Sequence, residues 1–381
     1  MNLGRRAFWR GLWGWLAGGV AFVAMAGLAL GAEPIRIGVA GPLTGDQAPF
    51  GEQLLNGTRL AADEWNQRGG VLVGGVRRPV ELRLGDDQRD PRQGVAVAHK
   101  FLNAGVVGVI GHFNSSVSIP ASTIYNDGGV VQITPASTNP QLTDRGLQLV
   151  FRVCGRDDQQ GRVGAEFIVD RLKKRRVAVL HDKTTYGQGL ADETVKSLRQ
   201  KGVAPVFYSG IVQGDKDFTA VLTTVKQKGP EVLYFGGIYP EAILLVRQAR
   251  ALGMDATFVS GDGVWAREFI EIAGKAAEGS YISFTPDQSL IPAAKQIMEA
   301  HLRRFRSEAG AYTVYSYVAL DLLLRAIEAT QSTKGPVLAE FLRKTKFETA
   351  LGPIQFDSKG DVLESPYVFW EVRGGKFVQV R

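Results

Sequence analysis

The feature that most constrains this chain is a regular alternation between short, apolar, β-rich runs and amphipathic helical patterns. In chain order the runs are IRIGVAG, VELRLGD, VVGVIGH, VVQITPA, RRVAVLHD, APVFYSGIV, EVLYFGG, ATFVSGD and SYISFTP. Such alternation is typical of βα units, in which helices connect parallel strands and cover the sheet. The sequence therefore predicts an α/β fold with parallel sheets.

The length of the chain and one polar stretch predict two sheets. The 381 residues exceed the size of a typical single domain, and the composition changes near Val153–Gln160, where GRDDQQG separates two sets of apolar runs. We expect the chain to cross there from one doubly wound sheet to another. A long helical section, Leu290–Gln331, follows the second set, and the tail from GPIQFDSKGD to VFWEV adds short strands to either half.

Residues 1–32 differ from the rest of the chain. Three arginines precede a charge-free run, Gly11–Leu30, and small residues just before Glu33 provide a cleavage site. This order of parts predicts a secretory signal peptide, removed on export to the periplasm. A retained membrane anchor is the alternative, since about 20 apolar residues can span a bilayer. The paired arginines in RRAFWR also fit a twin-arginine signal, so the export route stays open.

The composition of the mature chain argues against a nucleic-acid-binding protein and against a protein stabilised by internal disulfides. Without the first 32 residues the net charge falls from +7 to +4, because three of the 45 basic residues and none of the 38 acidic ones are removed. So mild an excess does not predict a nucleic-acid partner. Cys154 is the single cysteine, so no disulfide forms within the chain, and its apolar surroundings predict a buried small hydrophobe.

Hydroxyl-rich loops follow two neighbouring strands of the first predicted sheet. Ser115 comes after the run that ends at Ile110, and Thr138 comes after the run Val130–Ile133, next to the carbonyl of Ala136. In open parallel sheets, ligands bind beyond the carboxyl ends of the strands. Ser115 has the alternative of capping its own helix, but two such loops on adjacent strands can hold one carboxylate or phosphate between them.

The second half of the chain supplies the opposite charge. Asp262 follows a strand and lies between two glycines, where backbone approaches closely, although an Asx turn that faces water is the alternative. Aromatic and aliphatic side chains also follow strands: Phe50, Tyr186 and Ile238, the last beside Tyr239. Each of them alone fits plain packing. Together, a predicted anion-binding site, a predicted cation-binding site and apolar side chains between them match the chemical groups of an α-amino acid.

Several stretches carry a resemblance to a known family. They are GVAGPLTGDQAPFGEQLLNGTRLAADEWNQRGG, IGHFNSSVSIPAS, TPASTNPQLTDRG, HDKTTYGQGLA, GDKDF, YFGGIYPEA, RQARALG, AAEGSYISF and GPIQFDSKGD. With them the mature chain resembles, over nearly its whole length, the periplasmic solute-binding proteins of ABC importers for branched-chain amino acids. The resemblance implies a type I fold: two Rossmann-like lobes joined by three crossing segments. The limits it implies are 33–155 plus 286–364 for the N-terminal lobe and 156–285 plus 365–381 for the C-terminal lobe.

The resemblance also implies roles for particular residues. Ser115 and Thr138 match hydroxyls that hold the ligand carboxylate, Ala136 offers a carbonyl to the ammonium, and Asp262 matches an acidic ammonium partner. Phe50 matches an aromatic at the pocket mouth, and Tyr186 matches a tyrosine that closes over the ligand.

Two departures from the family pattern stand out. Arg89 and Asn114 occupy positions where some relatives have a half-cystine pair. Ile238 stands where an aromatic often lines the side-chain pocket, so the pocket is reshaped and a bulkier or unbranched ligand stays open. The implied protein is a monomer without cofactor or metal, whose partners are a small amino acid and a membrane permease.

Other classes of protein fit the residues less well. The glycines after the first strand lack the spacing of a dinucleotide site, and Ser260 lacks the first glycine of a hydrolase elbow. The histidines show no metal-ligand spacing, although His112 and His181 follow strands and flank a predicted cleft. An α/β hydrolase and a sensing domain for amides or other small organic solutes remain the alternatives to a transport receptor.

Overall fold

The computed structural model describes residues 32–380, so the signal peptide predicted for residues 1–32 lies outside the described residues except for Ala32. The first of its two large sheets has the strand order β4-β1-β5-β6-β7, with every neighbouring pair parallel. Its strands are β1 (Ile35–Gly41), β4 (Val80–Asp86), β5 (Gly108–Ile110), β6 (Val131–Thr134) and β7 (Val150–Arg152).

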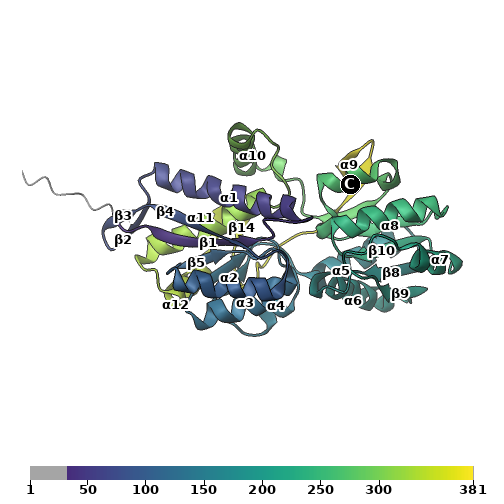
Figure 1. Ribbon diagram of the computed structural model, residues 1–381, viewed down its shortest axis with the longest axis horizontal. Helices are drawn as coiled ribbons and strands as arrows, with labels where there is room; N and C mark the ends of the chain where they lie inside the picture. Colours follow the sequence, from purple (N-terminus) through teal and green to yellow (C-terminus); the bar gives the residue numbers. More distant parts are fainter. Residues whose placement is uncertain (1–31, 381) are drawn as a thin grey trace, which may run out of the picture. The chain divides into compact units, whose positions relative to one another are not determined.

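Helices cover both faces of the first sheet (Figure 1). On one side lie α1 (Ala48–Gln67), α11 (Thr313–Thr330) and α12 (Gly335–Lys344), and on the other lie α2 (Pro91–Asn103) and α3 (Ser115–Asp127). α1 and α11 approach closely because α1 has a glycine at the contact: a Cβ on Gly57 would lie 2.1 Å from the carbonyl oxygen of Thr313. Helices thus shield the apolar faces of the sheet and leave its strand ends open to loops.

The second sheet has the order β16-β15-β12-β11-β10-β8-β9. The five strands from β12 to β9 pair in parallel, and β15 and β16 add two antiparallel strands at one edge. The strands are β8 (Val177–His181), β9 (Phe207–Gly210), β10 (Val232–Gly236), β11 (Thr257–Ser260), β12 (Tyr281–Phe284), β15 (Val368–Arg373) and β16 (Lys376–Gln379).

The second sheet is also covered on both faces. α5 (Asp157–Glu166) continues into a π-helical turn, Phe167–Arg171, and packs against α6 (Thr185–Gln200) on one side. α8 (Tyr239–Ala251) and α9 (Arg267–Ala273) lie on the other side, and α7 (Thr219–Gln227) packs against α8 (Figure 1). The remaining elements are β2 (Val71–Val73), β3 (Val76–Arg78), α4 (Gln141–Asp144), α10 (Pro292–Phe305), β13 (Phe347–Thr349) and β14 (Gly352–Ile354).

The prediction of a two-sheet α/β fold is confirmed, and every predicted apolar run contains one of these strands. The helical section predicted for Leu290–Gln331 consists of α10 and α11, separated by a turn in which Arg306 has a φ of 58°. Five strands were missed: β2, β3, β7, β13 and β16. Of these, β7, within LVFRVCG, is only three residues long, and its run was interpreted as a setting for Cys154 alone. The tail divides, because β15 and β16 join the second sheet while β13 and β14 pair with each other.

Three segments connect the two sheets. They lie between β7 and α5, between β12 and α10, and between β14 and β15. The lobe limits given above remain a prediction, because sheet membership fixes only the strands and not the residues of these segments.

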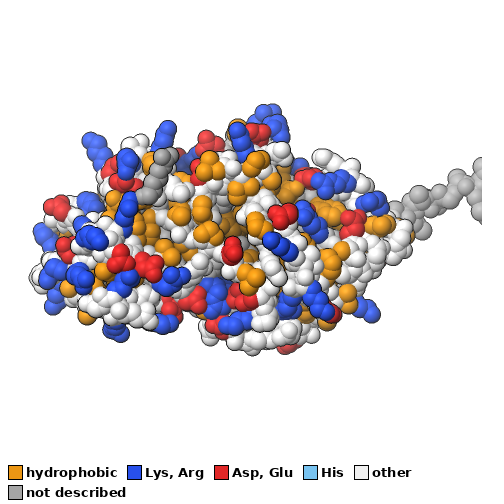
Figure 2. All heavy atoms as spheres, turned by 180° about the vertical axis from the view of Figure 1, so that it is seen from behind, with side chains coloured by type: hydrophobic (Ala, Val, Ile, Leu, Met, Phe, Trp, Pro, Cys, Tyr) orange, Lys and Arg blue, Asp and Glu red, His pale blue; other side chains and the backbone are white. Residues whose placement is uncertain are grey.

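Charged side chains of both signs lie on the surface, and the single cysteine lies in the core. Figure 2 shows acidic and basic side chains interspersed over one face, with no large area of a single sign. Within residues 32–380, no helix combines the length and the apolar character needed to cross a bilayer. Cys154 is buried as predicted, and burial raises the pKa of its thiol, which makes it a poor nucleophile at neutral pH.

Candidate functional site

A small cavity lies where the strand-end loops of the two sheets face each other. Its volume is about 20 Å³, which is room for roughly one water molecule. Side chains from both halves of the chain therefore fill most of the space between these loops. The lining residues are Phe113, Asn114, Ser115, Ala136, Tyr186, Ile238, Asp262, Gly263 and Tyr312.

A second, smaller cavity shares a wall with the first. It measures about 10 Å³ and is lined by Thr138 and Cys154 together with Asp262 and Tyr312, which also line the first cavity. Five of the predicted site residues thus surround one cavity, and a sixth, Thr138, lines its neighbour. The structure brings residues from both halves of the sequence to one place.

Ser115 lies at the start of α3 but does not cap it. The N-cap position belongs to Asn114, and no side chain caps this helix end. The buried Ser115 hydroxyl instead accepts a hydrogen bond from the backbone N–H of Asn139, at 3.3 Å. The capping alternative is therefore wrong, and the hydroxyl links two strand-end loops at the edge of the cavity.

Thr138 has the properties of a ligand-binding hydroxyl. It is 1% exposed, and its Oγ1 is buried without a hydrogen-bond partner. Its carbonyl accepts from the N–H of Asp157 at 3.0 Å, which fixes the backbone of the loop. A buried hydroxyl without a partner is costly unless a ligand or water completes it.

Asp262 is held between two tyrosines. Its Oδ1 accepts from the Tyr186 hydroxyl at 2.8 Å, and its Oδ2 accepts from the Tyr312 hydroxyl at 2.8 Å. The N–H of Gly263 donates to the Tyr186 oxygen at 3.0 Å, so this tyrosine relays between backbone and carboxylate. Burial raises the pKa of Asp262. The alternative of an Asx turn that faces water is wrong, because Asp262 is only 4% exposed.

Asp157 is a candidate site residue that the sequence did not reveal. It is fully buried at the first position of α5, and neither carboxylate oxygen has a hydrogen-bond partner. Burial, and next the charge of Asp262, raise the pKa of Asp157 well above its ordinary value. The only signal was the acidic pair in GRDDQQG, which was interpreted as a surface crossing.

The two buried carboxylates define the electrostatics of the site. Among the described residues neither carboxylate forms an ion pair: Asp262 accepts from the hydroxyls of Tyr186 and Tyr312, and the nearby charge of Arg152 lowers the pKa of Asp157 less than burial raises it. A buried carboxylate in this position either binds a proton or meets a cation. The site thus combines two buried carboxylates with the buried hydroxyls of Ser115 and Thr138.

The aromatic residues are arranged differently from the prediction. Phe50 is fully buried but does not line either cavity, and it stacks behind Phe113 with ring centroids 4.6 Å apart. Phe113 and Tyr312, which the sequence did not single out, form the wall in its place, in edge contact at 4.9 Å. Ile238 lines the cavity as expected.

The histidines near the cleft have structural partners. His112 is fully buried, and its two ring nitrogens lie 2.7 Å from Asp87 Oδ2 and 3.0 Å from the Tyr125 hydroxyl. His181 accepts from the N–H of Lys183 at 3.1 Å. Among residues 32–380, no three His, Cys, Asp or Glu side chains gather as metal ligands would. Both ring nitrogens of His112 are thus engaged by protein partners, as is Nδ1 of His181.

Comparison with known proteins assigns this architecture. A model described as "Periplasmic binding protein" matches residues 34–376. The chain belongs to this family. Members of the family bind solutes and are not enzymes, so the hydrolase alternative is wrong.

Relatives with assigned names extend over almost the whole of this periplasmic binding protein. A Leu/Ile/Val-binding protein homolog from Brucella abortus (strain 2308) is 45% identical and covers 93% of this chain and 94% of its own. A leucine-, isoleucine-, valine-, threonine- and alanine-binding protein from Pseudomonas aeruginosa is 38% identical, covering 92% of this chain and 93% of its own.

Solved structures confirm the two-lobed type I fold. A leucine-binding protein from Thermotoga maritima superposes with a TM-score of 0.84 at 32% identity, covering 91% of this chain and 98% of its own. A branched-chain amino acid transporter substrate-binding protein from Streptococcus pneumoniae, in complex with isoleucine, gives 0.81 at 25% identity and covers 91% and 100%.

Proposed function

We propose that this protein is the extracytoplasmic receptor of an ABC importer, which captures a branched-chain or related amino acid between its lobes and delivers it to a membrane permease. The observation that carries the proposal is the buried carboxylate of Asp262 in a cavity lined by both halves of the chain, with Asp157 and the Thr138 hydroxyl buried nearby. The names of the relatives support the same ligand class.

The ligand in this proposal is a zwitterion whose two ends are recognised separately. Its carboxylate binds the hydroxyls of Ser115 and Thr138, and its ammonium binds Asp262, Asp157 and the carbonyl of Ala136. Both ends need partners, because a buried charge without one is prohibitive. The apolar side chain lies against Ile238, and the smaller isoleucine leaves more room than an aromatic would.

Contacts between the lobes support closure around the ligand. The side-chain amide of Asn139, from the first lobe, donates to the carbonyl of Thr185 in the second at 2.8 Å. The hydroxyl of Tyr239, from the second lobe, donates to the carbonyl of Asp46 in the first. Contacts that exist only when the lobes are together favour the closed form, and a ligand that touches both lobes adds to that preference.

Export and docking complete the proposal. The signal-peptide pattern of residues 1–32 fits delivery to the periplasm, and a closed pair of lobes presents a surface that the permease distinguishes from the open pair. Calorimetric titration of the mature protein with a panel of amino acids and amides tests the ligand class. Saturable binding of leucine, isoleucine or valine supports the proposal, and binding of none of the panel contradicts it.

The carboxylates should matter for binding more than for folding. Asp262→Asn and Asp157→Asn keep the side-chain shape but remove a charge, so we expect each to weaken leucine binding by about 10- to 100-fold, the equivalent of roughly 1.5–3 kcal/mol for a charge-assisted hydrogen bond. Thermal unfolding of the free protein should be unchanged or occur at higher temperature, since an uncompensated buried charge is removed.

Asp321→Asn is the matched control for these two variants. Asp321 is also buried and acidic, but it lies on α11 and already has partners, with Trp65 Nε1 at 3.0 Å and Arg325 at 2.7 Å. Its replacement should leave leucine affinity unchanged. Unaltered affinity in both site variants would remove the carboxylates from the binding site.

Ligand binding should release protons. In the free protein burial raises the pKa of both Asp157 and Asp262, so part of the population is protonated above the ordinary pKa near 4. An ammonium favours the ionised form. Leucine affinity should therefore rise with pH above about 4.5. The stability of the free protein should change in the opposite direction, because the two bound protons stabilise the folded state and are lost as the pH rises.

Calorimetry at one pH in buffers of different ionisation enthalpy measures this release directly. A positive number of protons released per leucine bound agrees with the two-carboxylate site. Proton uptake, or affinity that does not change between pH 4.5 and pH 8, disagrees with it.

Closure should depend on a glycine in α6. A Cβ on Gly189 would lie 2.4 Å from Asn139 Nδ2 and displace it from Thr185. Gly189→Ala should thus weaken leucine binding about fivefold, the loss of one hydrogen bond of roughly 1 kcal/mol. The same change should not lower the melting temperature, because alanine favours a helix interior over glycine.

Gly164→Ala is the control for helix propensity. Gly164 also lies within a helix, but a Cβ there would meet its nearest neighbour at 3.6 Å, an ordinary contact within the second lobe. We expect its leucine affinity to equal that of the wild type. Equal affinities for Gly189→Ala and Gly164→Ala would show that the Asn139 contact has no part in closure.

A further inference from the structure

We propose that Arg152 is a positioning residue, whose guanidinium holds the loop Ser137–Asn139 so that Thr138 faces the ligand carboxylate, and which ties this loop to two of the segments that connect the lobes. The ligand part of this inference rests on the function proposed above. The loop part does not, because it concerns contacts of the free protein.

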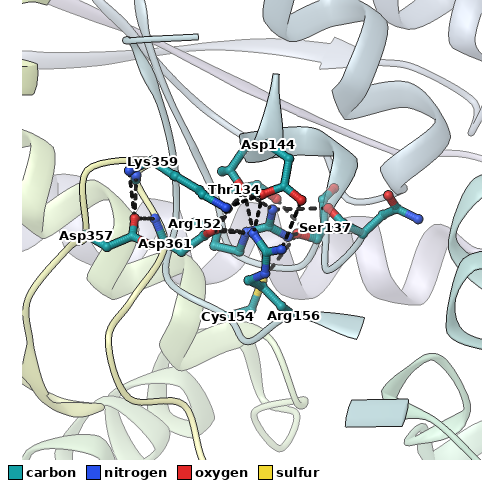
Figure 3. Close-up of polar contacts among 12 residues, drawn as sticks. Thr134, Ser137, Asp144, Arg152, Cys154, Arg156, Asp357, Lys359 and Asp361 are labelled. Carbon is teal, nitrogen blue, oxygen red and sulfur yellow. Dashed lines mark hydrogen bonds and ion pairs between the residues drawn. The ribbon is translucent and has the colours of Figure 1, made fainter. Parts of the chain in front are cut away.

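Arg152 is the last residue of β7 and is completely buried. Nη1 donates to the carbonyl of Ser137 at 2.8 Å (Figure 3). Nη2 donates to the carbonyl of Asn139 at 3.1 Å. Nη2 also donates to Thr143 Oγ1 at 2.7 Å. One planar group therefore binds the carbonyls on both sides of Thr138.

These contacts determine which polar groups of the loop remain available to a ligand. The carbonyl of Thr138 itself is taken by the N–H of Asp157 at 3.0 Å. Three consecutive carbonyls, from Ser137 to Asn139, are thus engaged by protein donors, while the Thr138 hydroxyl is buried without a partner. A loop whose carbonyls are held away from the cavity presents donors toward it, which is the arrangement that a carboxylate requires.

The same guanidinium reaches the lobe-connecting segments through Asp361. Arg152 Nε lies 2.5 Å from Asp361 Oδ1, and Arg156 Nη1 lies 2.6 Å from Asp361 Oδ2 (Figure 3). Asp361 belongs to the segment between β14 and β15, and Arg156 belongs to the segment between β7 and α5. Thr143 Oγ1 donates to Asp361 as well, at 2.9 Å.

The cluster does not act as a binding site of its own. Its cations are matched by carboxylates: Arg156 also contacts Asp144 at 3.1 Å and Asp158 at 3.0 Å, and Lys359 lies 2.7 Å from Asp144. Figure 3 shows the side chains of Asp144, Arg156 and Lys359 directed at one another. A charge-balanced network of this kind, buried at Arg152 and Asp361 and exposed at Asp144 and Lys359, fixes geometry rather than attracting a further ion.

The test compares Arg152→Lys with the wild type in two measurements. Lysine keeps the charge but cannot bind two carbonyls in one plane. In amide hydrogen exchange of the free protein, we expect faster exchange at Asn139, at Asp157 and in the two connecting segments, with the strands of both sheets unchanged. Exchange that is unchanged in the loop, or faster throughout the first lobe, would overturn the positioning role.

The second measurement uses leucine and leucinamide, which differ only at the carboxylate end. Arg152→Lys should weaken leucine binding about tenfold or more and leucinamide binding much less, since only leucine has a carboxylate that binds the Thr138 hydroxyl. Equal loss for the two ligands would indicate a merely structural role and overturn the proposal. If wild-type protein binds neither ligand, the proposed function fails, and hydrogen exchange still decides the role of Arg152.

Two further variants complete the test. One perturbs the same contacts from Asp361, and the other controls for the general effect of replacing arginine by lysine. Asp361→Asn keeps the acceptor oxygen but removes its charge, and it should give the same exchange pattern in a milder form. Arg250→Lys is the matched control, because Arg250 Nη1 also donates to two backbone carbonyls, Met254 at 2.6 Å and Ala256 at 2.9 Å, in the second lobe. It should leave the leucine-to-leucinamide ratio at the wild-type value.

Discussion

In the function proposed above, the site depends on the interaction between two buried carboxylates and a cation supplied by the ligand. Asp157 and Asp262 come from different segments, and each is withdrawn from water. Their mutual repulsion raises the free energy of the ligand-free site whenever both are ionised. A ligand ammonium would relieve that repulsion. The higher free energy of the ligand-free site would thereby contribute to the free energy of binding.

The fold explains how carboxylates come to be buried in this way. Parallel strands of both sheets end toward the same gap, so the loops that follow them converge there without any long insertion. The backbone of these loops is held by other parts of the protein, as Asp157 holds Thr138 and Arg152 holds Ser137. In the proposed function, where the two lobes move relative to each other, such rigid loops give a site that is precise when closed and accessible when open.

The sequence predicted those parts of the site that follow local rules. Ser115, Thr138 and Asp262 were found because each directly follows an apolar run, and a residue in that position lies at the carboxyl edge of the sheet. Asp157 and Arg152 were not found, because their burial depends on the path of the chain between the lobes, which no local pattern encodes. Phe50 was placed correctly in its loop, yet Phe113 stands between it and the cavity, a matter of side-chain packing alone.

The most direct test of this account is a crystal structure of the mature protein with bound leucine. The account predicts the ligand nitrogen within about 3 Å of a carboxylate oxygen of Asp157 or Asp262, and the ligand carboxylate at a similar distance from the hydroxyls of Ser115 and Thr138. A ligand in the reverse orientation, or one bound outside the gap between the lobes, would contradict it.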